Sequence, residues 1–72
     1  MSTNVQIEVT LNGEVRAIPQ GQTILRLLES LGLDPARVAV ELDRRIVKPH
    51  DWGTTPIGGG ARLEIVQFVG GG

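Results

Sequence analysis

The apolar residues of this chain repeat with the period of a β-strand in most segments and with the period of an α-helix in only one. Apolar and polar residues alternate, as in a strand with one buried face, over residues 5–11, 38–42 and 62–68, and residues 14–18 are compatible with a further strand. Helical spacing of three and four joins Ile24, Leu27, Leu28 and Leu31. A single helical stripe needs an apolar sheet to cover. We therefore predict an α+β fold, with a mixed sheet of four to five strands and one helix packed on one face.

Residues that favour turns and helix caps lie at the ends of these segments. Asn12-Gly13 favours a type I′ hairpin turn, because both residues tolerate a positive φ. Thr23 is placed to cap the start of the helix, which we expect to run for about three turns. Gly32 is placed to end it in the left-handed conformation, with Leu33 completing a Schellman motif.

The segment before the last strand contains most of the remaining Pro and Gly residues. Ile46-Val47 is predicted as a short strand ended by Pro49, and residues 48–60 are predicted to be mostly loop. We expect Trp52 to fill the core beneath this loop. The order of elements is strand, strand, helix, strand, short strand, strand. This order is typical of a β-grasp, in which the first and last strands are adjacent and parallel.

Composition excludes several classes of function. Of the 72 residues, 7 are Lys or Arg and 8 are Asp or Glu, so a net charge of −1 offers no positive field for nucleic acid. The sequence has no cysteine and one histidine, His50, which argues against disulfides, a thiolate nucleophile and most zinc sites. No apolar run is long enough for a signal peptide or a membrane span. We expect a cytoplasmic protein with no catalytic residues, metal or bound cofactor, and no contact with nucleic acid or membrane.

Three glycines, Gly70, Gly71 and Gly72, follow the last predicted strand and close the sequence. Glycine-rich chain ends are commonly frayed, so the triplet alone is a weak signal. Its position directly after a strand favours a working tail over a linker. We therefore predict one domain over residues 1–69 and a flexible tail over residues 70–72.

Taken in order, several short segments resemble the ThiS family of ubiquitin-like β-grasp proteins, the sulfur carriers of thiamine biosynthesis. They are residues 11–14 (LNGE), 31–33 (LGL), 38–42 (VAVEL), 46–47 (IV) with Trp52, and 63–72 (LEIVQFVGGG). The resemblance covers nearly the whole chain. Two loops depart from the family pattern: Asp43-Arg44-Arg45 replaces a turn that often carries Asn-Gly, and residues 58–61 lack a common acidic residue.

This resemblance implies a chemistry for the last residue. The Gly72 carboxylate would be adenylated by a ThiF-like enzyme that uses ATP and Mg²⁺, and a cysteine-derived sulfur would convert it to a thiocarboxylate. The sulfur would pass to a ThiG-like thiazole synthase for thiazole ring formation. Gly70, Gly71 and Gly72 would enter the partner's active site, and the chain would be a protein co-substrate, not an enzyme.

Strand parity indicates where a partner would contact the folded domain. Alternation turns Leu63 and Ile65 toward the helix and leaves Val66 and Phe68 on the outer face. We predict that these two exposed residues and Val69 form the partner-binding surface.

Other functions fit the same pattern. The small subunit of molybdopterin synthase and a carrier for tRNA thiolation would share the tail chemistry, although molybdopterin relatives commonly have prolines before the final glycines and this chain has Phe68-Val69. A ubiquitin-like interaction module with no carrier role is the alternative from a different class.

Overall fold

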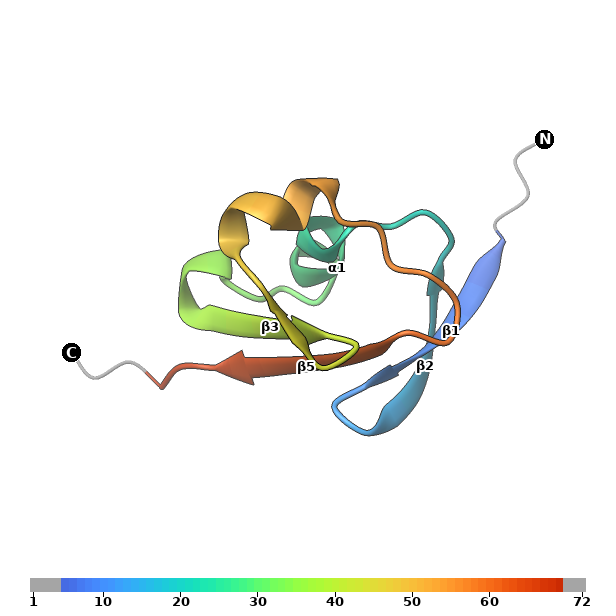
Figure 1. The fold of residues 1–72 in the computed structure, drawn as a ribbon, viewed down its shortest axis with the longest axis horizontal. Coiled ribbons are helices and arrows are strands. Elements are labelled where there is room, and N and C mark those ends of the chain that lie inside the picture. Colours follow the sequence, from blue (N-terminus) through green and yellow to red (C-terminus); the bar gives the residue numbers. More distant parts are fainter. Residues whose placement is uncertain (1–4, 70–72) are drawn as a thin grey trace.

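The computed structural model describes residues 5–69, which form one mixed five-stranded sheet with one α-helix across one face (Figure 1). In chain order the elements are β1 (Gln6–Leu11), β2 (Glu14–Pro19), α1 (Ile24–Ser30), η1 (Pro35–Arg37), β3 (Val38–Leu42), β4 (Arg45–Val47), η2 (Pro49–Thr54) and β5 (Arg62–Gln67), where η marks a 3₁₀-helix. The strand order is β2-β1-β5-β3-β4. Only the β1–β5 pair is parallel. The predicted α+β class and the adjacent, parallel first and last strands are confirmed.

The caps of the helix are those that the sequence predicts, but the helix is shorter. Thr23 Oγ1 accepts a hydrogen bond from the Arg26 backbone N–H at 3.3 Å. Gly32 has a φ of 72°, and the Leu33 N–H donates to the Leu28 carbonyl at 3.0 Å, which is the Schellman geometry. Helix α1 has 7 residues, about two turns instead of three. Leu31, with ψ of −4°, is the C-cap, and even when it is counted the span 24–31 makes only about 2.2 turns, so the expected three turns were too many.

The prediction of a loop over residues 48–60 is wrong in its first half. Residues Pro49–Thr54 form η2, in which Pro49 supplies the fixed φ that suits a first helical position. Trp52 lies in η2 and is 2% exposed, and its indole Nε1–H donates to the Val47 carbonyl at 2.8 Å. Burial of this ring, which the sequence predicts, therefore comes from a short helix and not from an irregular loop.

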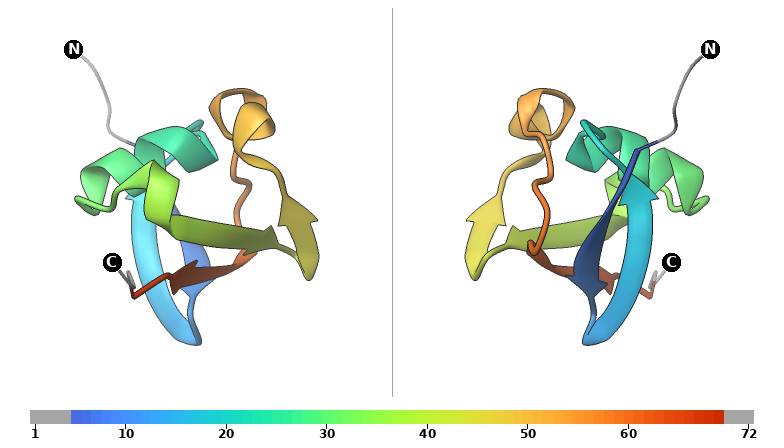
Figure 2. Two further views of the ribbon diagram at one scale, coloured as in Figure 1. Left: turned by 90° about the vertical axis from the view of Figure 1, so that its left-hand side faces the viewer. Right: turned by 90° about the vertical axis from the view of Figure 1, so that its right-hand side faces the viewer.

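The core lies between the sheet and the two helices α1 and η2. Figure 2 shows both helices on the same side of the sheet. The buried side chains are all apolar: Val9, Leu11, Ile18, Ile24, Leu27, Leu28, Val38, Val40, Trp52, Ile57, Ala61, Leu63 and Ile65. No helix within residues 5–69 has the length and apolar character needed to cross a membrane.

Two hairpin turns, one on each side of strand β5, hold it by hydrogen bonds. In each turn the first residue makes the bond through its side chain. Asn12, with φ of 50°, donates from Nδ2 to the Ile65 carbonyl at 3.2 Å and accepts from the Ile65 N–H at 2.8 Å. Asp43, with φ of 51°, accepts from the Arg62 N–H at 2.9 Å. The Asn12 amide thus continues the β1–β5 pairing past the point where β1 turns away. Both turns place a polar side chain on the backbone of the strand that leads toward the C-terminus.

We expect Asn12→Gly to lower the free energy of unfolding by roughly 2 kcal/mol, because glycine keeps the positive φ but removes two hydrogen bonds to Ile65. Urea denaturation followed by circular dichroism measures the change. Asp43→Gly is the matched variant, since it removes one such bond from a turn of the same geometry and should cost about half as much. An Asn12→Gly variant as stable as the wild type would show that its amide does not hold β5.

Candidate functional site: the C-terminal end of β5 and the outer face of the sheet

The chain leaves the folded domain just after β5. Strand β5 ends at Gln67, and the next residue, Phe68, is still held because its N–H donates to the Arg37 carbonyl at 2.7 Å. Val69 is 97% exposed. Gly70, Gly71 and Gly72, which the sequence predicts as the tail, lie outside the described residues.

Only three residues connect Val69, the last described residue, to a group on residue 72. An extended chain covers at most about 3.5 Å per residue, so three residues beyond Val69 reach about 10 Å. Because that distance is short, any enzyme that acts on Gly72 must lie against the end of β5.

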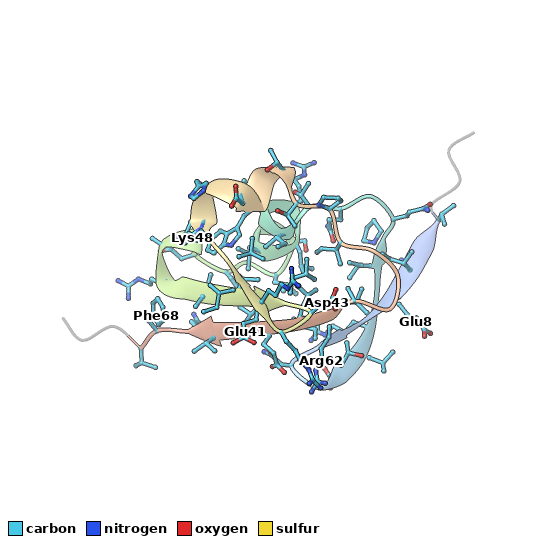
Figure 3. The ribbon with its side chains drawn as sticks, viewed as in Figure 1. Glu8, Glu41, Asp43, Lys48, Arg62 and Phe68 are labelled. Atoms are coloured by element: carbon cyan, nitrogen blue, oxygen red, sulfur yellow. The ribbon has the colours of Figure 1, made fainter. Side chains whose placement is uncertain are left out.

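The outer face of the sheet carries the surface residues that the sequence predicts. Leu63 and Ile65 are buried beneath the helix layer, whereas Val66 is 59% and Phe68 53% exposed. Val66 lies opposite Ala39 of β3. Figure 3 shows Phe68 at the end of β5 farthest from Glu8 of β1. Exposure is therefore as expected at these positions, and their role in binding stays a prediction.

The surface predicted from sequence leaves out Ile46, an exposed apolar residue of this face. Ile46 of β4 is 76% exposed and lies opposite Glu41 of β3. The signal is weak in the sequence because β4 has only three residues, too few for an alternation to show which face each occupies.

The same face brings two carboxylates together. Glu41 of β3 and Glu64 of β5 are directly opposite in the antiparallel register. Arg62 Nε lies 4.0 Å from Glu64 Oε1, with both side chains about half exposed, and Glu41 makes no ion pair within residues 5–69. Figure 3 shows Glu41 and Arg62 on the side of the sheet away from α1.

The described residues do not assemble a metal site. Within residues 5–69, no three side chains of His, Cys, Asp and Glu cluster as metal ligands would. His50 is exposed in η2, with its Nε2 at 3.4 Å from Asp51 Oδ2. What the described residues offer a partner is an exposed surface at the end of β5.

Two curated relatives are similar to this chain over 66 residues, or 92% of its length. One is a thiazole synthase of Paramagnetospirillum magneticum, 38% identical, and the other a thiazole synthase of Magnetococcus marinus, 35% identical. The chain spans about one fifth of the length of each, since the matched part is 20% of the relative.

Two solved structures from Geobacter metallireducens share the fold. The crystal structure of a thiamine biosynthesis protein (ThiS) superposes with a TM-score of 0.80 at 25% identity, covering 92% of this chain and all of that one. The solution structure of a thiamine biosynthesis protein from the same organism gives 0.77 at 26% identity, covering 92% and 88% of the two chains.

The last comparison concerns the family as a whole. The ThiS family model matches residues 9–72, from the second half of β1 through β5 and the three glycines. The ubiquitin-like β-grasp order of elements, the structural likeness and this match agree. The chain belongs to the ThiS family.

Proposed function

We propose that this chain is a sulfur carrier of thiamine biosynthesis, whose Gly72 carboxylate is adenylated and then converted to a thiocarboxylate. One observation carries the proposal: the match to the ThiS family extends through Gly72, only five residues after β5 ends at Gln67. A carboxylate at that position has a folded domain close behind it and can enter another protein's active site. The chain acts as a co-substrate and catalyses no step itself.

Adenylation makes chemical sense for this group. A carboxylate is a poor electrophile, and attack of its oxygen on the α-phosphate of ATP expels pyrophosphate and gives a mixed anhydride. The outer sulfur of a cysteine-derived persulfide then attacks the acyl carbon, and AMP leaves. A thiol must cleave the resulting acyl disulfide to release the thiocarboxylate. Because the chain has no cysteine, that thiol belongs to a partner.

Two enzymes are required by this sequence of steps. The first is a ThiF-like adenylating enzyme, which binds the ATP and Mg²⁺, so the carrier needs no cofactor. The second is a ThiG-like thiazole synthase that accepts the sulfur. The two relatives named thiazole synthase support it, since a segment like this chain forms part of each. A chain without disulfides suits a reducing cytoplasm.

Val66, Phe68 and Val69 form the surface that we propose for docking. Ordering a glycine-rich tail in an active site costs conformational entropy, so binding energy must come from the folded domain. These residues are exposed, apolar and next to the point where the chain leaves the fold. Their burial by the partner would supply that energy.

We expect Val66→Asp to weaken binding to the adenylating enzyme on the order of tenfold, because it removes an apolar contact and adds a carboxylate that must be desolvated in the docked state. Isothermal titration calorimetry measures the affinity. Val15→Asp is the matched control, since Val15 is also exposed but lies on β2, two strands away from β5. Equal affinities for wild type and Val66→Asp would remove Val66 from the interface.

The acceptor of the sulfur is tested by isotope transfer. The carrier is loaded with heavy-isotope sulfur and divided among thiazole synthase, the large subunit of molybdopterin synthase and a tRNA-thiolating enzyme, each with its substrates. The proposal predicts labelled thiazole and negligible label in the other two products. Label in molybdopterin or tRNA alone would contradict the assignment to thiamine biosynthesis.

A further inference from the structure

The second feature of the outer face, beside its apolar residues, is a pair of like charges held together by the backbone. The register sets Glu41 directly opposite Glu64, which places their Cβ atoms roughly 5 Å apart. Like charges directly opposite in a sheet are destabilising. Either glutamate could be replaced by a neutral residue without disturbing the buried face, because both lie on the outer one.

Nothing within residues 5–69 neutralises this pair fully. Arg62 approaches only Glu64, at 4.0 Å, the outer limit of an ion pair, and both side chains are about half exposed to water. Such exposed pairs contribute little. Glu41 has no cationic partner in the described part of the chain. The face therefore presents an excess of negative charge at its centre.

The carboxylates are flanked by apolar side chains. Ile46 lies opposite Glu41 on the β4 side, and Val66 lies two residues beyond Glu64 along β5. Val66 in turn faces Ala39, whose short side chain leaves space beside the acidic pair. A cationic side chain with an apolar stem suits this part of the face, because its charge can pair with the carboxylates while its stem packs on the apolar side chains. Arginine suits it best, since its guanidinium group offers five N–H donors to carboxylates.

We propose that Glu41 and Glu64 together receive an arginine of the adenylating enzyme, with Ile46 and Val66 packing against that arginine's stem and neighbours. The proposal rests on the proposed function for the identity of the partner. It adds a polar determinant to the apolar surface at the end of β5 and extends the docking surface to β4. The like-charge repulsion in the free carrier is relieved when the arginine docks.

The test is a binding titration of the chain against a ThiF-like adenylating enzyme without ATP, at several NaCl concentrations. Glu41→Gln/Glu64→Gln should raise Kd on the order of tenfold and flatten its salt dependence. Its urea midpoint should be equal to or above that of wild type, since repulsion is removed. A merely structural role would lower both affinity and stability. Glu8→Gln removes one charge from the same face on β1 and is the control, expected to bind as wild type.

Three results would overturn the inference: an unchanged Kd in the double variant, the same loss in Glu8→Gln, or a loss of affinity for thiazole synthase alone. Failure of the proposed function is seen separately. Suppose that wild type binds more tightly than the double variant but gains no sulfur with ATP and a persulfide donor. This result would support the docking site and contradict the carrier function. If wild type is loaded but the double variant binds unchanged, the carrier function stands and the docking site falls.

Discussion

Deletion of Gly71 and Gly72 is expected to abolish sulfur loading and to leave the free energy of unfolding unchanged. The structural reason is that the core and the sheet are complete by Gln67, and the last backbone hydrogen bond in residues 5–69 near this end is made by Phe68. The chemical reason is reach. Without the two residues, the new terminal carboxylate stops about 7 Å short of its place in the active site.

Two measurements check this prediction. Intact mass after incubation with the adenylating enzyme, ATP, Mg²⁺ and a persulfide donor reports loading, and urea denaturation reports stability. Replacing Gly71 by valine keeps the length but adds a branched side chain where the partner's walls close on the backbone, and it should also block loading. A truncated chain that is still loaded, or that unfolds, would contradict the separation of tail and fold.

Trp52→Ala is expected to be the most destabilising single substitution, with a loss of about 3–5 kcal/mol. The indole is almost wholly buried, η2 contacts α1, and the indole N–H donates to the Val47 carbonyl of β4. A domain of this size has only about 4–11 kcal/mol of stability in total. The variant should therefore be partly or largely unfolded at room temperature.

Circular dichroism, not fluorescence, measures this loss, because Trp52 is the only tryptophan. Trp52→Phe is the control: it keeps an aromatic ring in the core but leaves the Val47 carbonyl without its donor, so its cost should be smaller. A Trp52→Ala variant within about 1 kcal/mol of wild type would mean that η2 contributes little to the fold.

Local sequence signals were sufficient for the elements that have a clear period or a diagnostic residue. The Asn12-Gly13 turn has positive φ at both residues, Thr23 caps the helix and Gly32 ends it in the left-handed conformation. Each of these depends on a few neighbouring residues whose conformational preferences agree. The parallel pairing of β1 with β5 followed from the order of elements and the usual connection rules.

Features that depend on tertiary contacts were not predictable. The sequence did not predict η2, because its Pro and Gly residues favour a loop locally. The short helix forms with Trp52 buried, and that burial depends on residues distant in the sequence. The turn at Asp43 and Arg44 lies where the sequence predicts one, but its positive φ values of 51° and 69° were not predictable, because these residue types seldom adopt them. Asp43 is held there in part by the backbone of Arg62, 19 residues later.

In the candidate site, too, features of a single strand were predictable from the sequence, whereas features that depend on the pairing of strands were not. Burial of Leu63 and Ile65 and exposure of Val66 follow from alternation within one strand. The Glu41–Glu64 pair depends on the register between β3 and β5, which a single strand does not reveal. Ile46 was missed because β4 is too short to show a period. The predicted tail, Gly70–Gly72, lies outside the described residues, and its role rests on the family.

The measurement that tests the central claim most directly is the mass of the C-terminal fragment of this chain. The chain is incubated with the adenylating enzyme, ATP, Mg²⁺ and a persulfide donor, then digested and analysed by mass spectrometry, with ATP omitted in the control. The account predicts that the fragment ending at Gly72 gains the mass difference between sulfur and oxygen, and only with ATP. An unchanged fragment, with an enzyme shown to load another ThiS protein, would contradict the sulfur-carrier function and favour an interaction module.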